Sequence, residues 1–202
     1  MQRHGAPPRE QLLAELSEWL HNTLGIRMLG SLGFENAYAL AMASKRAAAL
    51  DIRSITDLAG RAGGLTIAGD YEIFARPEWA ALRNAYGLNF RTQRQMQPEF
   101  MYKAVADGEV DVIAAYTSDG QISTYDLTVL EDDKHAIPPY DAILLISPKR
   151  AGDAKLIAAL KPIIGSIDVA TMRAANARAS NGSETPDAVA RWLAGAIEKK
   201  RD

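Results

Sequence analysis

The sequence of 202 residues predicts an α/β fold, in which helices cover a sheet that contains parallel strands. The segment VDVIAAY (110–116) is almost continuously apolar, which is typical of a strand covered on both faces. LTIAG (65–69) is a second, shorter candidate for a buried strand. Segments that begin with proline and have helical character separate these runs, and such alternation favours the α/β class.

The first elements along the chain are predicted to be a helix and two strands. In residues 9–26, leucines and a tryptophan recur at helical spacing, with Arg, Glu and Ser on the other side, so this segment is an amphipathic helix. Two short apolar runs follow at 26–34 and 37–42. Gly30 and Gly33 interrupt the first run, which suits a strand or a crossing segment better than a helix.

Three helices are predicted in the middle of the chain from their first residues. Ser54 lies three residues before Asp57, which is the signature of a capping box, and glycines at 60, 63 and 64 end this short helix. Pro77 and Pro98 are each followed by an acidic residue, and both features suit the first turn of a helix.

The C-terminal part of the chain is predicted to be mainly helical. Helices are expected near 153–160, 167–178 and 186–199. In the last of these, Thr185 is the expected cap and Pro186 the first helical residue.

Composition excludes several classes of function. The 23 basic residues are scattered and the formal net charge is −2, so nucleic acid and anionic membranes are poor candidate partners. The absence of cysteine excludes thiol catalysis, disulfides, thiolate zinc sites and iron–sulfur clusters. The sequence shows neither a signal-peptide pattern nor a long apolar span, so we expect any export to depend on sequence outside these residues.

No catalytic or metal site and no cofactor is predicted. The histidines are far apart in the sequence, and surface positions explain them better than a metal site or a triad. The acidic run at 130–135 reads as a solvated loop. The glycines of 60–65 lack the spacing of a phosphate-binding loop and are better explained as the end of a helix. The histidines in question are His4, His21 and His135.

Three tyrosines lie where a predicted element meets a loop. Tyr38 is at the start of one strand, Tyr116 ends another, and Tyr140 follows a double proline. Ligand sites are built at such positions. Taken alone, however, tyrosines of this kind are more often half-buried core residues, and Arg76 would ordinarily be a surface arginine.

Four segments together resemble one family, the substrate-binding proteins of osmoprotectant ABC importers, which take up glycine betaine, choline, carnitine and related quaternary amines. The resemblance extends over residues 26 to 195 and implies a type II periplasmic-binding-protein fold. In that fold two α/β lobes are joined by two crossing strands and close on the ligand. The segments are LGFENAYALAM (32–42), IAGDYEIFARPEW (67–79), MYKAVADGEVDVIAAYTSDGQI (101–122) and VLEDDKHAIPPYDAILL (129–145).

The resemblance implies a ligand site. It assigns Tyr38, Tyr116 and Tyr140 to an aromatic cage for the trimethylammonium head, and Asn36 to the polar position two residues before the first of them. Arg76 matches the arginine that holds the ligand carboxylate in betaine-binding members. A quaternary ammonium has no N–H donor, so aromatic faces must attract it, each by about 0.5–2 kcal/mol.

The resemblance also implies that one lobe is incomplete. Family members carry roughly a hundred further residues before the segment that matches 32–42, a length that fits the usual size of a domain. We therefore expect residues 37–141 to form a whole second lobe, while 1–36 and 142–202 form only the remainder of the first. This organisation suggests a truncated gene, a fragment, or one piece of a longer polypeptide such as a permease fusion.

The implied function is that of a solute-binding component, or a fragment of one, without enzymatic activity. Its partners would be a quaternary amine and an ABC permease subunit at the periplasmic or extracytoplasmic face of the membrane. The incomplete first lobe also leaves room for self-association. The alternative is the ligand-sensing effector domain of a regulator with the same fold, for which no helix-turn-helix is visible.

Overall fold

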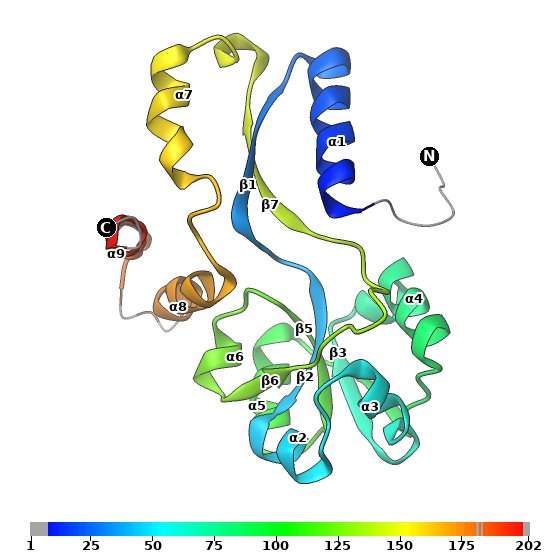
Figure 1. Ribbon diagram of the computed structural model, residues 1–202. Helices are drawn as coiled ribbons and strands as arrows, with labels where there is room; N and C mark the ends of the chain where they lie inside the picture. The colour runs from blue at the N-terminus through cyan, green and yellow to red at the C-terminus, as the bar shows by residue number, and fades with distance from the viewer. Residues whose placement is uncertain (1–7, 181, 183, 200–202) are drawn as a thin grey trace.

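The protein is described here from a computed structural model, which places residues 8–180, 182 and 184–199 (Figure 1). It has two parts, which we name by their sheets. The sheet lobe extends from β2 to β6, residues 38–129, and contains five strands. The ribbon part contains the two-stranded sheet of β1 and β7 together with α1 and the helices after β7.

The five-stranded sheet is mixed, with the order β4-β3-β5-β2-β6. Strand β3 runs parallel to β4 and β5, whereas β2 runs antiparallel to β5 and β6. The expected parallel arrangement therefore holds for one side of the sheet only. The strands are β2 (Tyr38–Ala43), β3 (Thr66–Gly69), β4 (Thr92–Gln95), β5 (Val112–Tyr116) and β6 (Leu127–Val129).

A hydrophobic core lies on each face of this sheet. Side chains alternate along a strand, so Leu40 and Ala114 face one core, and Ala41 and Ile113 face the other. Helices α2 (Ser44–Leu50), α3 (Ile55–Ala59) and α4 (Pro77–Tyr86) cover the first face, and α5 (Pro98–Ala106) and α6 (Gln121–Thr124) cover the second. Burial on both faces explains why the strand sequences are almost continuously apolar.

Two long strands connect the lobe to the ribbon part and pair with each other. Strand β1 (Arg27–Glu35) leads into the lobe and β7 (Asp141–Ile146) leaves it, and they run antiparallel. In Figure 1, α1 (Arg9–Leu24, blue) and α7 (Ala154–Leu160, yellow) lie on opposite sides of this ribbon. The last helices, α8 (Val169–Ser180) and α9 (Pro186–Lys199), pack on each other, and α8 also contacts α6 of the sheet lobe.

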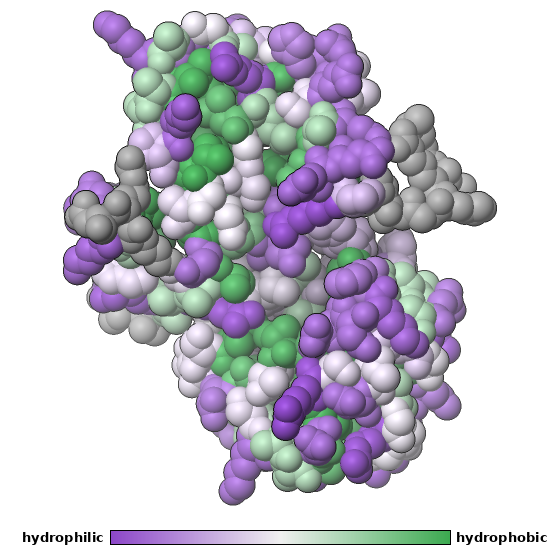
Figure 2. Space-filling view, in the orientation of Figure 1, coloured by the Kyte–Doolittle hydropathy of each residue, from purple (hydrophilic) through white to green (hydrophobic). Residues whose placement is uncertain are grey.

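The ribbon part is much less buried than the sheet lobe. Among the described residues, α1 buries Leu20 alone and α7 buries none. Trp19, Leu24 and Leu145 are exposed, and Figure 2 shows apolar surface over the part that holds α7 and the ribbon. No helix in the described part of the chain is long and apolar enough to cross a membrane.

Local sequence signals placed several helix ends correctly. Ser54 and Asp57 form a complete capping box at the start of α3. Pro77 and Pro98 occupy the first position of α4 and α5. The Thr185 hydroxyl accepts a hydrogen bond of 3.3 Å from a backbone N–H in the first turn of α9, as expected for a cap.

Helix α8 joins the two parts through the loop that follows β5. The side chain of Arg173 donates to the carbonyl oxygen of Thr117 at 2.6 Å. Asn176, one turn further along the helix, donates to the carbonyl oxygen of Ser118 at 2.8 Å. These bonds satisfy backbone groups directly after a buried strand, so they fix the helix against the end of β5.

The close approach of α8 predicts that Gly120 tolerates no side chain. A Cβ atom there would lie 2.2 Å from the backbone nitrogen of Ala177, so the helix would have to move. We expect Gly120→Ala to lower the free energy of unfolding by about 1–3 kcal/mol in urea denaturation. Gly195→Ala in α9 is the control, because nothing lies within 4 Å of its Cβ position and helix propensity favours alanine. Equal stability of the two variants would contradict the docking described above.

Candidate functional site

The site begins with a cross-strand pair of tyrosines. Tyr38 is the first residue of β2 and Tyr116 the last of β5, and the antiparallel register places them directly opposite each other. Opposite residues share one face of the sheet, so both rings lie on the side of α3 and α4. Their ring centroids are 4.8 Å apart, with the planes tilted by 36°.

Tyr140 adds a third ring from the segment that returns to the ribbon. Its carbonyl oxygen accepts a hydrogen bond of 3.0 Å from the backbone N–H of Asn36, which ties the end of this segment to the end of β1. The ring stands edge-on to Tyr38, with the centroids 6.3 Å apart and the planes at 85°. Tyr140 remains 39% exposed, whereas Tyr38 is 6% exposed. The three rings form what we call the aromatic corner.

Arg76 lies on this corner. It precedes Pro77 as the cap of α4, and its Nε donates to the Tyr38 hydroxyl at 3.0 Å. Its guanidinium carbon stands 5.7 Å from the centroid of the same ring, within the range of a cation–π contact. The hydrogen bond to Tyr38, and to a lesser degree the nearby carboxylate of Glu72, raises the pKa of Arg76 above its ordinary value.

Asn36 lies beside the corner, but its side chain is engaged elsewhere. Its Oδ1 accepts a hydrogen bond of 2.6 Å from the hydroxyl of Ser118. The structure thus brings all five sequence-predicted residues into one region. Tyr116, Tyr140 and Arg76 each contact Tyr38, and the Asn36 side chain is bonded to the loop after β5.

Sequence analysis missed two carboxylates behind the corner. Asp70, directly after β3, lies 3.5 Å from the hydroxyl of Tyr116, which also donates to the Tyr38 hydroxyl at 3.1 Å. Glu78, in the first turn of α4, accepts a hydrogen bond from the Tyr140 hydroxyl. The position of Asp70 at the end of a strand that runs parallel to β5 was the available signal, since such strand ends meet at one edge. Glu78 was interpreted only as a helix-dipole residue.

The rings of Tyr116 and Tyr140 stay neutral at physiological pH. Burial, together with the hydrogen bond to Tyr38, raises the pKa of Tyr116. The hydrogen bond to Glu78 raises the pKa of Tyr140 to about 12 and lowers the pKa of the Glu78 carboxyl. The described residues contain no cluster of His, Cys, Asp or Glu suited to a metal ion. The site therefore offers three aromatic rings, a guanidinium and the ionised carboxylate of Glu78.

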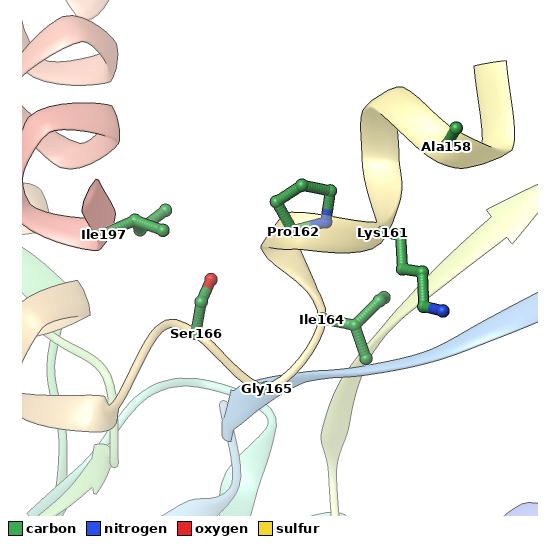
Figure 3. A pocket seen from close by; sticks show the side chains of 7 residues that line it. All are labelled: Ala158, Lys161, Pro162, Ile164, Gly165, Ser166 and Ile197. Atoms are coloured by element: carbon green, nitrogen blue, oxygen red, sulfur yellow. The ribbon is translucent and has the colours of Figure 1, made fainter. Parts of the chain in front are cut away.

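One cavity lies beside the aromatic corner, and another lies away from it. One of about 880 Å³ has Tyr38 in its wall and extends toward the start of α1 and the segment 135–139. Another, of about 570 Å³, lies between the end of α7 and α9, and no aromatic side chain lines it (Figure 3). Of the three rings of the corner, Tyr38 alone lines the first cavity, and none lines the second.

The fold defines a class, the α/β periplasmic binding proteins. A family model described as the substrate binding domain of ABC-type glycine betaine transport systems matches residues 11–195. The chain therefore belongs to this family, called OpuAC. Its members are extracytoplasmic solute-binding proteins and not enzymes.

Several named proteins are similar to the chain. A glycine-betaine-binding protein of Pseudomonas aeruginosa is 34% identical over an alignment of 184 residues that covers 85% of this chain and 59% of that protein. The carnitine transport binding protein OpuCC of Listeria monocytogenes is 27% identical, with 90% of this chain and 60% of that protein covered. The chain thus spans about three fifths of the length of these relatives.

Solved structures show the same fold. A structure titled as a glycine betaine/carnitine/choline ABC transporter superposes with a TM-score of 0.85 at 24% identity and covers 96% of this chain and 74% of that one. The lactococcal OpuAC, closed on glycine betaine, gives a TM-score of 0.55 at 17% identity, with 91% and 74% covered. The predicted periplasmic-binding-protein fold is confirmed.

The geometry predicts an unusual titration of Tyr140. Carbon-13 NMR of labelled tyrosine measures this titration, and the Tyr140 resonance is assigned by its loss in Tyr140→Phe. The Tyr140 hydroxyl should remain largely protonated at pH 11, because its pKa is raised to about 12. An ordinary tyrosine has a pKa of about 10 and would be mostly ionised there. In Glu78→Ala the midpoint should move toward the ordinary value, because the hydrogen bond that is the principal cause of the shift is gone. A midpoint near 10 in the unsubstituted protein would contradict the hydrogen bond.

Proposed function

We propose that the chain is a solute-binding component, or part of one, that takes quaternary amines such as glycine betaine or choline for an ABC importer. The observation that carries the proposal is the aromatic corner. Three tyrosine rings from three separate segments converge beside one arginine. The names of the relatives from Pseudomonas aeruginosa and Listeria monocytogenes support the same class of ligand.

The chemistry of the ligand fits the corner. A trimethylammonium group carries charge but no N–H, so aromatic faces attract it and carbonyl acceptors do not select it. The position of Arg76 supports this assignment, because its guanidinium carbon already lies 5.7 Å from the centroid of the Tyr38 ring, within cation–π range. Rings at 85° to each other can cover two sides of a rounded head group at once.

Arg76 is proposed to hold the carboxylate of glycine betaine or carnitine. Its side chain is 47% exposed, so a ligand can reach the guanidinium without unfolding of the site. Arginine can bind a carboxylate through two parallel hydrogen bonds, which add geometric specificity to the charge. Asn36 is proposed to contribute to the site through the backbone bond that fixes Tyr140.

We further propose a division into 1–36, 37–141 and 142–202, in which the middle segment is a whole lobe and the others are part of a second lobe. The thin burial of the ribbon part supports this division, and its exposed apolar residues favour self-association or a further protein surface. The partner would be an ABC permease subunit, which the chain would meet at the periplasmic or extracytoplasmic face of the membrane. A relative from Helicobacter pylori, 32% identical over 119 residues, is named as both a permease and a binding protein. None of the relatives named above is a regulator.

Replacement of Arg76 should separate two ligands that share a head group. We expect Arg76→Ala to reduce the affinity for glycine betaine by a factor at least about ten times larger than its effect on the affinity for choline. Choline lacks the carboxylate that makes a charge-assisted contact. Calorimetric titration with both ligands measures the difference. Arg83→Ala, an exposed arginine on the same helix, is the control and should change neither affinity. Equal losses for both ligands would contradict the role assigned to Arg76.

The isolated chain of 202 residues should bind glycine betaine more weakly than the complete relative from Pseudomonas aeruginosa. Tyr140 is 39% exposed, so water competes at that ring, and an exposed cation–π contact contributes only about 0.5–1 kcal/mol. The loss of two desolvated contacts of about 2 kcal/mol each corresponds to about 4 kcal/mol, and so to more than a hundredfold in Kd. Side-by-side titration of both proteins tests this expectation, and micromolar binding by the monomeric chain would contradict it.

A further inference from the structure

Glu78 is a buried carboxylate whose charge has no ion-pair partner among the described residues. The residue is 9% exposed. One oxygen accepts a hydrogen bond from the hydroxyl of Tyr140, and the other, Oε2, is buried without any hydrogen-bond partner in the described part of the chain. The nearest guanidinium, that of Arg76, pairs with the exposed carboxylate of Glu72.

Such an arrangement is costly unless the charge has a use. A buried carboxylate oxygen without a donor loses its hydration and receives nothing in return. The N-terminus of α4 offsets part of this cost, because the first-turn N–H groups favour a negative charge. A glutamine at this position would accept the same hydrogen bond from Tyr140 without the charge.

We propose that Glu78 determines the preference of the aromatic corner for cations over neutral molecules of the same shape. This inference rests on the function proposed above and assigns the charge discrimination of that site to one residue. Glu78 acts through Tyr140 and need not touch the ligand, so it is a positioning residue.

Two effects of the carboxylate follow from its bond to Tyr140. The bond holds the most exposed of the three rings, which otherwise contacts only Tyr38 within the corner. A carboxylate that accepts a hydrogen bond from a phenol also polarises the phenol and pushes electron density into the ring. The ring face then attracts a cation more strongly, since that attraction depends on its negative quadrupole.

The negative charge of the Glu78 carboxylate also attracts a bound cation directly. A cation on the face of Tyr140 lies within several ångströms of the carboxylate, in a partly dry site where charges interact more strongly than in water. A neutral ligand of the same shape gains the packing but neither the polarised ring nor the charge. Selectivity for a cation is therefore the property that loss of Glu78 should change.

The experiment compares choline with its neutral isostere 3,3-dimethyl-1-butanol, in which carbon replaces nitrogen. NMR titration of the full chain gives both affinities for the unsubstituted protein and for Glu78→Gln. We expect the substitution to weaken choline about tenfold, which corresponds to about 1.4 kcal/mol, and to change the neutral isostere less than about twofold. Glu78→Asp, which keeps the charge, should recover part of the preference.

Glu99→Gln is the matched control. Glu99 also follows the first-turn proline of a helix, α5, but it is exposed, so this variant removes the same charge from the same helical position away from the corner. It should leave the affinities for both ligands unchanged.

The remaining outcomes distinguish failure of the proposed role of Glu78 from failure of the proposed function. Equal weakening of choline and the isostere in Glu78→Gln would assign Glu78 a purely structural role and overturn this inference, and so would an unchanged choline affinity. Failure of the unsubstituted protein to bind choline and glycine betaine at millimolar concentration would overturn the proposed function, and this inference with it.

Discussion

The pairing of β2 with β5 is the constraint on which the site depends. Because residues opposite each other in an antiparallel pair share a face, the register that sets Tyr38 against Tyr116 also decides which core both rings join. A shift of β2 by one residue would turn Tyr38 toward α5 and α6 and dissolve the corner. The alternation of apolar side chains between the two cores prevents that shift, so packing of the sheet lobe fixes the geometry of the proposed ligand site.

The start of α4 carries charges of both signs next to the rings. Arg76 and Glu78 are two residues apart, one before and one after the proline that opens the helix. Arg76 contacts Tyr38 from the half-exposed side, whereas Glu78 holds Tyr140 from a buried position. A zwitterion such as glycine betaine carries the complementary pair of charges on a short backbone. In the proposed site, the start of α4 therefore supplies both Arg76 for the ligand carboxylate and Glu78, which holds a ring for the ammonium head.

Sequence reasoning predicted those features that local physics determines. The caps at Ser54 and Thr185 and the buried strand β5 follow from residues within one turn or one strand, and the structure contains them. Strand β4 was missed because its residues are all exposed and carry no apolar pattern. The convergence of the three tyrosines came from family resemblance, because it depends on strand register across 78 residues of sequence separation. The role of Glu78 required a partner 62 residues away, which no local pattern reveals.

Some aromatic and apolar side chains of this chain are buried from water and others are not, and this difference affects both its stability and its proposed ligand binding. Tyr38 is almost fully buried, but Tyr140 retains 39% of its exposure, so the corner is dry on one side only. Trp19 and Leu145 in the ribbon part are exposed in the same way. Cation–π attraction and hydrophobic burial both strengthen when water leaves. Additional protein surface against the ribbon part would therefore stabilise the fold, and additional surface against Tyr140 would tighten ligand binding. Both gains would arise from the removal of water.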